Sequence, residues 1–280
     1  MQTHTQCIWG RAVVGHGFYY HRKSGDSRIN RNISMQANPF NLQGKTFLVT
    51  GASSGLGRQI CVRISEMNGT VILTARNLKR LEETRQAMQP GDHSLIPADL
   101  TSAEETENLV QKLPKLNGAA FSTGISIIAP TGFITQHDYN QTFQTNFEAS
   151  LMLSNQLIRK KKLIRDACSL VFISSISTRY PFVGGALYVS AKAAMEGYAR
   201  VLAIELAHKG IRVNCVSPAF VKTQMLNQTA NDFSGEVVKK IEEKQLLGLG
   251  EPDDVANPVV FFLSDASKWV TATNLILGGG

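Results

Sequence analysis

The chain is organised around the stretch Thr46-Phe-Leu-Val-Thr50-Gly51-Ala-Ser-Ser-Gly55-Leu-Gly57. An apolar run typical of a buried β-strand leads into three closely spaced glycines, and a helical pattern from Leu56 to Met67 follows. Glycines at such a junction permit a tight turn and a close approach of the backbone to a phosphate group. The N-terminus of the following helix offers free N–H groups and the positive end of its dipole to the same anion. The stretch therefore predicts a pyrophosphate-binding turn between the first strand and the first helix.

The same alternation of strand and helix continues along the sequence. Further strand-like runs lie at 70–75, 94–97, 118–122, 169–174, 211–216 and 274–277. Helical patterns lie between them, at 78–88, 102–113, 136–165 and 187–208. Such alternation forms βαβ units, whose right-handed crossovers place helices on both faces of a parallel sheet. We therefore predict an α/β fold, a single-domain, Rossmann-like, doubly wound sheet of seven parallel strands.

The residues after the second strand indicate which dinucleotide is bound. An acid at this position binds the ribose 2′-hydroxyl of NAD(H), whereas a nearby arginine accommodates the 2′-phosphate of NADP(H). Here the strand is followed by Arg76 and Asn77, with Lys79 and Arg80 close behind and no acid among them. The sequence therefore predicts NADP(H) as the preferred cofactor. NAD(H) is the alternative, in which Arg76 is only a solvated residue at the start of a helix.

A second group of polar residues surrounds the fifth predicted strand. That strand ends in Ser175, and thirteen residues later Tyr188 begins a helix on which Lys192 follows by four. Positions four apart lie on one face of a helix, so the phenol and the ammonium can address the same point. A nearby cation favours the phenolate form, and a tyrosine tuned in this way can donate or accept a proton. The tyrosine–lysine pattern alone also occurs by chance on amphipathic helices, so its meaning depends on the rest of the chain.

Composition and charge exclude several classes of protein. The chain has 280 residues, of which 43% are hydrophobic and 18% charged, as is ordinary for a globular protein. No apolar run reaches the roughly 18 residues of a membrane span. The net charge is +7, but residues 1–34 supply +4 of it, with five basic side chains against one acid, and nucleic-acid binding is not expected. The six histidines and four cysteines lack metal-ligand spacing, so we expect no metal site and reduced, mostly buried thiols.

The first forty residues differ from the rest. They lack hydrophobic periodicity, and we expect residues 1–40 to form a disordered basic extension before a dinucleotide-binding domain of residues 41–280. An arginine-rich, acid-poor start is typical of a mitochondrial transit peptide. We favour the alternative, a translated upstream segment with the working start at Met35 and a cytoplasmic protein.

Taken together, these motifs resemble those of the short-chain dehydrogenase/reductase family, in the single-domain branch that includes 3-oxoacyl-acyl-carrier-protein reductases. The resemblance runs from about Leu42 to Gly280 and rests on several motifs in the family's order. They are the glycine turn Thr50–Gly57, the Asp99-Leu100 pair that the family uses at the adenine ring, Asn146, Ser175, and Tyr188 with Lys192.

The resemblance implies hydride transfer between a nicotinamide and a carbonyl or alcohol substrate, with a 3-oxoacyl thioester among the candidates. It implies that Ser175 hydrogen-bonds the substrate oxygen and that Tyr188 is the general acid/base. Lys192 would lower the tyrosine pKa and hold the nicotinamide ribose, and Asn146 would support a water that connects Lys192 to solvent. The implied cofactor contacts are Thr50, Gly51, Ser53, Ser54, Gly55, Leu56, Gly57, Arg76, Asn77, Asp99, Leu100, Gly124, Tyr188, Lys192, Pro218, Val221 and Thr223.

Three short segments depart from the family pattern. The family's Asn-Asn-Ala-Gly is Phe121-Ser-Thr-Gly124 here, in which Ser122 or Thr123 can support the backbone but Phe121 cannot replace an amide. The usual Pro-Gly is Pro218-Ala219, which is tolerated if the φ angle of the alanine is negative. The common Asp-Gly-Gly is Gly278-Gly-Gly280. None of these changes removes a catalytic group.

The resemblance further implies a homotetramer or homodimer packed through the two long helices and the C-terminus, and a substrate-covering segment at about 224–245. One other function is a catalytically silent, nucleotide-sensing binding protein, against which the intact catalytic group argues. Another is a sugar-nucleotide epimerase or dehydratase, which uses the same tyrosine–lysine pair. Such enzymes need a longer substrate region than the roughly sixty residues after Pro218. No motif names the substrate.

Overall fold

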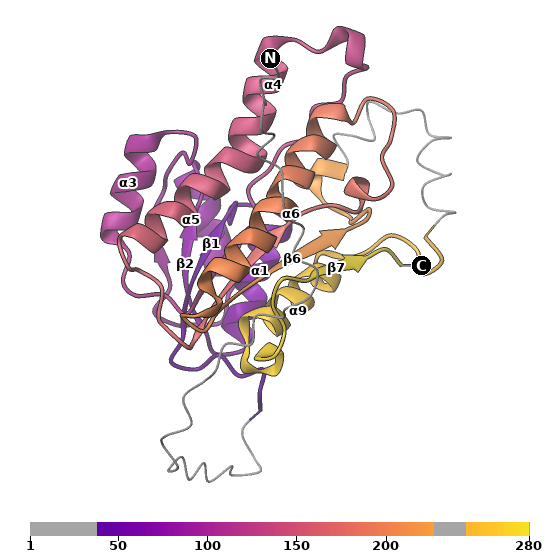
Figure 1. Ribbon diagram of the computed structural model, residues 1–280. Helices are drawn as coiled ribbons and strands as arrows, with labels where there is room; N and C mark the ends of the chain where they lie inside the picture. The colour runs from indigo at the N-terminus through magenta and orange to yellow at the C-terminus, as the bar shows by residue number, and fades with distance from the viewer. Residues whose placement is uncertain (1–37, 227–244, 280) are drawn as a thin grey trace, which may run out of the picture. The chain divides into compact units, whose positions relative to one another are not determined.

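Within residues 38–226 and 245–279, the part of the chain that the computed structural model describes, seven parallel strands form one sheet (Figure 1). Their order is β3-β2-β1-β4-β5-β6-β7, so the chain moves outward from β1, returns to its other side as β4 and moves outward again. The strands are β1 Thr46–Thr50, β2 Thr70–Thr74, β3 Ser94–Leu95, β4 Gly118–Phe121, β5 Cys168–Ile173, β6 Ile211–Pro218 and β7 Asn274–Leu277.

Helices cover both faces of the sheet because the central strands are apolar on both sides. In β1, Phe47 and Val49 face one layer of helices and Leu48 faces the other. The first layer consists of α1 Gly55–Glu66, α2 Leu78–Gln86 and α9 Pro252–Leu263. The second consists of α3 Ala103–Lys112, α4 Gln136–Phe143, α5 Ala149–Arg159 and α6 Ala186–Ala207 (Figure 1). The prediction of a doubly wound parallel sheet is confirmed.

The single helix expected over 136–165 is wrong in two respects. A π-helical segment, η2 Gln144–Glu148, separates α4 from α5, and the helix ends at Arg159. There Lys161 adopts a positive φ of 53°, and the N–H groups of Lys161 and Lys162 donate back to carbonyls of the last turn. This is a Schellman ending, which usually contains glycine, and because no glycine stands here the end of the helix could not be predicted from the residues. The other predicted elements differ from the observed ones by no more than two residues at an end.

Two expected segments fall largely outside the described residues. Of the extension at 1–40 only residues 38–40 are described, and the carbonyl of Pro39 accepts a hydrogen bond from the N–H of Ala266. Of the covering segment at 224–245, residues 227–244 are outside. No helix of the described chain is long and apolar enough to cross a membrane.

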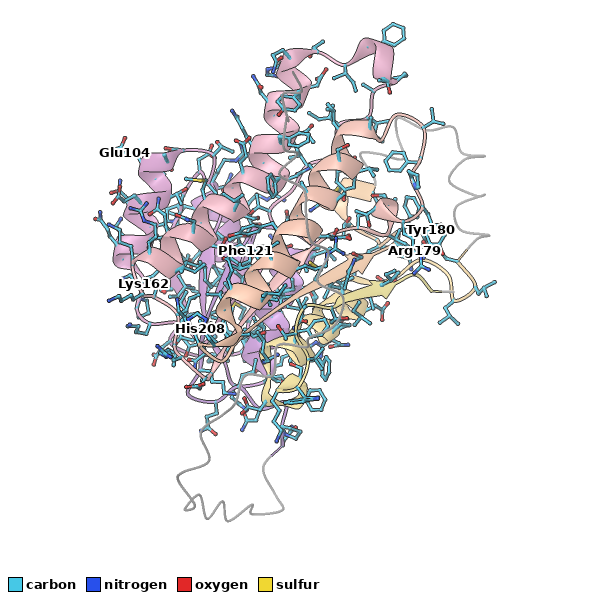
Figure 2. All side chains as sticks on the ribbon, in the orientation of Figure 1. Glu104, Phe121, Lys162, Arg179, Tyr180 and His208 are labelled. Atoms are coloured by element: carbon cyan, nitrogen blue, oxygen red, sulfur yellow. The ribbon has the colours of Figure 1, made fainter. Side chains whose placement is uncertain are left out.

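Phe121, which stands where the family has an amide, belongs to the core. It is the last residue of β4, is 1% exposed, and lies among the packed side chains behind α5 and α6 (Figure 2). Its ring stacks on Phe172 of β5, with centroids 4.4 Å apart and ring planes 6° from parallel. The side chain at the end of β4 is therefore an aromatic ring packed between β4 and β5, and not an amide that could hydrogen-bond.

Phe121→Ala is expected to cost about 3–5 kcal/mol of unfolding free energy, because it removes a stacked ring from a closely packed site. Urea unfolding monitored by circular dichroism measures this loss. Phe133→Ala is the matched control, since the Phe133 ring is 78% exposed and its removal should leave stability almost unchanged. A cost below about 1 kcal/mol for Phe121→Ala would contradict the core position.

Candidate active site

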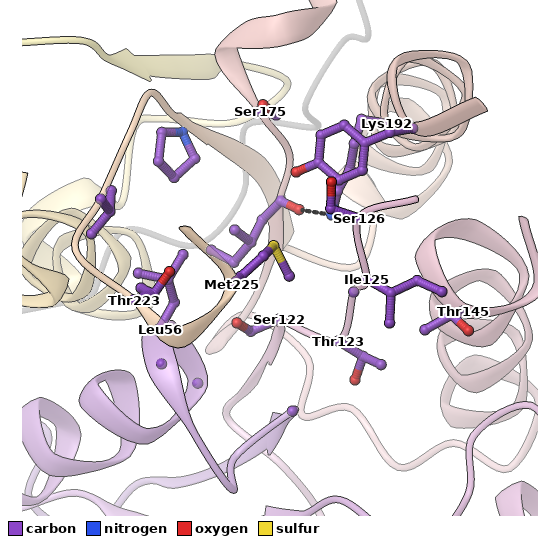
Figure 3. A pocket seen from close by; sticks show the side chains of 18 of the residues that line it. Leu56, Ser122, Thr123, Ile125, Ser126, Thr145, Ser175, Lys192, Thr223 and Met225 are labelled. Carbon is purple, nitrogen blue, oxygen red and sulfur yellow. Dashed lines mark hydrogen bonds between the residues drawn. The ribbon is translucent and has the colours of Figure 1, made fainter. Parts of the chain in front are cut away.

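A cavity of about 1440 Å³ lies at the carboxyl edge of the sheet, where parallel α/β sheets bind ligands (Figure 3). Most residues predicted to bind cofactor or substrate line it. They are Gly51, Ser53, Ser54, Gly55, Leu56, Gly57, Arg76, Asn77, Asp99, Leu100, Gly124, Ser175, Tyr188, Lys192, Pro218, Val221 and Thr223. Two predicted residues, Thr50 and Asn146, do not line the cavity and instead support its walls.

The glycine turn at one end of the cavity leaves no room for side chains. A Cβ on Gly51 would lie 2.8 Å from the carbonyl oxygen of Ser122, and one on Gly57 would collide with the carbonyl oxygen of Gly51. The φ of Gly51 is 64° and that of Gly55 is 51°, a region that side chains avoid. At the start of α1, the side chain of Ser54 makes no capping hydrogen bond and the first turn contains no acid. The first N–H groups of α1 therefore remain available to an anion, which fits a pyrophosphate.

The end of β2 presents positive charge to the cavity. Arg76 is exposed there, and the side chain of Asn77 accepts the N–H of Arg80 at 3.0 Å, which begins α2. Burial tends to raise the pKa of Asp99, but hydrogen bonds from Thr101 and the charge of Arg76 hold that pKa below its usual range. Both donors of Thr101 bind one carboxylate oxygen of Asp99, at 2.9 and 2.7 Å. Among the described residues that line the cavity, Asp99 is the only acid, and it is already hydrogen-bonded within its own loop.

Thr50 supports the chain that leaves β4. Its hydroxyl oxygen accepts the backbone N–H groups of Ser122 and Thr123, at 3.0 and 3.3 Å. The support expected from the side chain of Ser122 or Thr123 therefore comes from β1 instead. The Thr123 hydroxyl is buried at the cavity wall and has no hydrogen-bond partner among the described residues, which fits a wall that meets a polar ligand.

Tyr188 and Lys192 both belong to α6 and line the cavity. Figure 3 shows Lys192 at the cavity wall. Lys192 is 4% exposed, and its Nζ donates a hydrogen bond of 2.8 Å to the carbonyl oxygen of Ile173, the last residue of β5. The same Nζ lies 5.8 Å from the centre of the Tyr188 ring. The spacing of four residues therefore does bring the phenol and the ammonium to one place.

The pKa values of this pair are set mainly by burial. Burial lowers the pKa of Lys192 to about 8, because the charged ammonium loses hydration. Burial raises the pKa of Tyr188, and a hydrogen bond with Ser175 partly offsets that rise. The tyrosine pKa is thus not lowered overall in this structure, in contrast to the expected effect of Lys192.

Ser175 follows β5 and opens the short helix η3 Ile176–Thr178. Its hydroxyl oxygen accepts hydrogen bonds from the N–H of Ser177 at 3.2 Å and from the Ser177 hydroxyl at 2.9 Å. Because these two donors occupy its oxygen, the proton of Ser175 is left to donate elsewhere. Ser175 is therefore available as a hydrogen-bond donor, which is what the binding of a carbonyl oxygen requires.

Asn146 holds the loop after β4 and has no surface on the cavity. It lies fully buried in the π-helical segment η2, where its side-chain oxygen accepts the N–H of Ile125 at 2.7 Å and its amide donates to the carbonyl of Ile125 at 2.9 Å. A Cβ on Gly124 would lie 3.3 Å from the Asn146 oxygen and 3.5 Å from the Lys192 nitrogen. Asn146 is therefore next to Lys192, and its role beside a bridging water stays a prediction.

The chain after β6 closes the cavity on its far side. Ala219, which replaces the usual glycine, does not adopt a positive φ, so the condition for tolerating it is met. Val221 forms an isolated bridge with Gly250, and Gln245 binds the backbone of Phe220 through both side-chain ends. Gly278 lines the cavity where the family has a carboxylate.

An apolar wall lies beside Ser175 and Tyr188, and six of its residues were not predicted from the sequence, namely Ile125, Ile176, Tyr180, Pro181, Phe182 and Val183. The wall also includes Met225 and Leu226, which belong to the covering segment expected at 224–245. Figure 2 shows Tyr180 beside this edge of the sheet. The run Tyr180-Pro-Phe-Val183 was a usable signal, because aromatic and branched residues are unusual in an exposed loop.

Comparison with known proteins identifies the family. The family described as enoyl-(acyl carrier protein) reductase matches residues 51–280. The 3-oxoacyl-[acyl-carrier-protein] reductase FabG of Rickettsia felis is 30% identical, over 85% of this chain and 97% of its own. L-xylulose reductase of Caenorhabditis elegans is 32% identical, over 88% and 98%. The crystal structure of a dehydrogenase/reductase from Sinorhizobium meliloti 1021 has a TM-score of 0.78 and 31% identity, over 86% of this chain and 96% of that one.

The chain therefore belongs to the short-chain dehydrogenase/reductase family. It is an oxidoreductase of that type, from a family that uses a nicotinamide dinucleotide and acts on CH–OH and C=O groups.

Stability should rise with pH as Lys192 loses its proton. Its pKa is about 8 in the folded chain and 10.5 for a free side chain, so between these values the unfolded state binds more protons and the folded state gains stability. Lys192→Met removes the buried charge, so the nucleotide-free variant should be more stable than wild type by about 1–3 kcal/mol below pH 8. Urea unfolding from pH 7 to 10.5 should show this difference shrinking, and a constant difference would contradict the shift.

Proposed function

We propose that this protein is an NADP(H)-dependent carbonyl reductase or alcohol dehydrogenase in which Tyr188 is the general acid/base. The observation that carries the proposal is the convergence of Ser175, Tyr188 and Lys192 on one wall of a cavity whose other end holds the glycine turn and Arg76. Such a cavity offers a proton donor, a hydrogen-bond donor and a phosphate site along a single path.

The residues of the site then have the following tasks. When bound, the nicotinamide would supply the hydride for reduction or accept it in oxidation. Ser175 donates its free proton to the substrate carbonyl oxygen, and Tyr188 transfers its proton to that oxygen during reduction, or removes it from the alcohol during oxidation. With the cofactor bound, Lys192 would hold the nicotinamide ribose and its charge would oppose the effect of burial on the Tyr188 pKa, and Asn146 would support the water that returns a proton to Lys192. Val221 and Thr223 would hold the carboxamide and so select the face of the ring that is turned to the substrate.

The cofactor preference follows from charge at the end of β2. Arg76 is exposed at the cavity, and Arg80, which also lines it, donates a hydrogen bond of 3.0 Å to Gln224. Among the described residues at this end of β2 there is no acid that could bind a ribose 2′-hydroxyl. Guanidinium groups suit a phosphate because they donate in a planar fork. Asp99 and Leu100 then border the adenine, and NAD(H) is the weaker cofactor.

The apolar wall favours an apolar carbonyl compound, such as a 3-oxoacyl thioester, over a sugar. Beside Ser175 and Tyr188 the lining includes this aliphatic and aromatic wall together with the polar residues Ser126 and Ser177, and the charged residues Arg76, Arg80 and Asp99 lie toward the nucleotide end. A polyol would leave hydroxyl groups unpaired against the apolar wall itself, where only these few polar side chains could bind them. The name of the Rickettsia felis relative agrees with this choice, whereas that of the Caenorhabditis elegans relative describes a sugar reductase.

The proposal includes an assembly and a compartment. Large apolar side chains are exposed on the two long helices, Met152 on α5 and Val201 and Ile204 on α6. A homotetramer or homodimer would bury these faces. We further propose a catalytic domain at 41–280 after a basic extension, in a cytoplasmic protein, with a mitochondrial location if residues 1–34 act as a transit peptide.

Tyr188→Phe is expected to reduce turnover of an apolar ketone with NADPH at least about 100-fold, because general acid–base catalysis is lost. Its dissociation constant for NADPH, measured by fluorescence, should change little. Tyr198→Phe is the control on the same helix, since the Tyr198 hydroxyl binds Ser154 at 2.8 Å, outside the cavity. Nucleotide binding by wild type without turnover of any ketone or alcohol would favour the catalytically silent, nucleotide-sensing protein.

Arg76→Glu is expected to weaken NADPH binding about 10- to 100-fold and to leave NADH binding equal or tighter, because it removes a charge-assisted bond to the 2′-phosphate. Fluorescence titration with each nucleotide measures both constants. Arg85→Ala on α2 is the control, since Arg85 pairs with Glu82 away from the cavity. Equal affinities of the wild-type protein for NADPH and NADH would contradict the assignment of Arg76.

A further inference from the structure

Helix α6 carries a third polar residue on the side that faces the site. Glu196 lies one turn beyond Lys192 and is partly buried. One of its carboxylate oxygens, Oε1, accepts the hydroxyl of Ser174 at 2.6 Å and that of Thr178 at 2.8 Å. The Ser217 hydroxyl lies 3.3 Å from the same oxygen but donates at 2.7 Å to Asn274. The Thr178 hydroxyl, which has one proton, also lies 3.0 Å from the carbonyl oxygen of Ser175, and its contact with Glu196 is the shorter of the two. The two shortest bonds to Oε1 are therefore those from Ser174 and Thr178.

These two residues stand at the ends of the turn that contains Ser175. Ser174 continues the ladder of β5, with its N–H donating 2.8 Å to the carbonyl of Val216 in β6. Thr178 is the last residue of η3. Glu196 therefore ties the strand end and the helix end of one five-residue turn to α6, the helix that carries Tyr188 and Lys192.

Inside this turn the hydrogen bonds set which way Ser175 donates. Ser177 is buried and gives both its N–H and its hydroxyl proton to the Ser175 oxygen. Those bonds exist only while residues 175 and 177 keep the η3 geometry. A shift of the turn would release the Ser175 hydroxyl, and errors of about 1 Å in the placement of a reacting group can cost on the order of 100-fold in rate.

We propose that Glu196 is a positioning residue for the reaction: by holding Ser174 and Thr178 it fixes the turn so that the Ser175 hydroxyl donates toward Tyr188 and the substrate oxygen. The proposal rests on the proposed function, because it assigns Ser175 and Tyr188 their catalytic tasks. A carboxylate suits this role, because hydrogen bonds to a charged acceptor are about twice as strong as neutral ones.

The test compares Glu196→Ala with Glu196→Gln. Removing the acceptor should lower kcat for NADPH-dependent reduction of an apolar ketone about 10- to 100-fold, while the dissociation constant for NADPH stays within about twofold. The glutamine retains an oxygen that can accept both hydroxyl protons, so it should restore kcat to within about fivefold of wild type. Glu205→Ala, an exposed carboxylate on the same helix, is the control and should behave as wild type.

A second variant guards against loss of folding. Thr178→Val removes one of the two hydroxyl donors with little change of shape, and it should lower kcat by a smaller factor in the same direction. If Glu196→Ala lowers only the melting temperature, while kcat per nucleotide-binding site is unchanged, the carboxylate is merely structural and the proposal is wrong.

A spectroscopic readout separates this proposal from the proposed function. The ζ-carbon NMR shift of Tyr188, assigned by its absence in Tyr188→Phe, reports the hydrogen bond from Ser175 without any turnover. The shift should move in Glu196→Ala and return in Glu196→Gln. A shift that does not move overturns the positioning role even in an active enzyme. If it moves as expected while wild type reduces no carbonyl compound, the positioning stands and the proposed function fails.

Discussion

A buried ammonium bonded to a main-chain carbonyl is the interaction on which the site depends. Lys192 of α6 donates to the carbonyl of Ile173, at the end of β5, over 2.8 Å. This bond fixes the helix against the strand, and as a result Tyr188, one turn earlier, and Ser175, two residues past the strand, lie on the same wall. Removing an ammonium from water is costly, and a single carbonyl offsets only part of that cost. The burial of Lys192 therefore lowers the stability of the fold locally, at the proposed catalytic site.

The centre of the sheet shows how the same architecture is kept with different side chains. Where the family has an amide, this chain has Phe121 at the end of β4, and its ring turns into the core and stacks on Phe172. The backbone of Ser122 and Thr123 is held by the hydroxyl of Thr50, from the neighbouring strand. The path of the chain beside the cavity is therefore supported from β1 and does not need the amide.

The fold and most of the cofactor and catalytic residues at the cavity could be predicted from the sequence, because both follow from local patterns, whereas the apolar wall at Ile176 and 180–183 was missed. Alternating strand and helix signals fix a doubly wound sheet, and a tyrosine and a lysine four apart must share a helix face. What the sequence did not reveal depends on contacts between distant segments. The positive φ of Lys161, the inward position of Asn146 and the tie between Glu196 and Ser174 have no local signature. Burial raises the pKa of Tyr188, and this burial likewise exists only in the packed structure.

The pairing of β1 with β4 has a consequence for the kinetics of folding. The hydroxyl of Thr50 and the N–H of Ser122 are 72 residues apart in the chain, and the stack of Phe121 on Phe172 requires a further crossover. Closing such long loops costs entropy before any contact is gained, so parallel sheets of this kind form slowly. The unit β1–α1–β2 can form from near neighbours, whereas the cavity needs strands from both halves of the sheet. The cavity can therefore be complete only when both halves of the sheet have formed, because the first half alone contributes the glycine turn and not the catalytic residues.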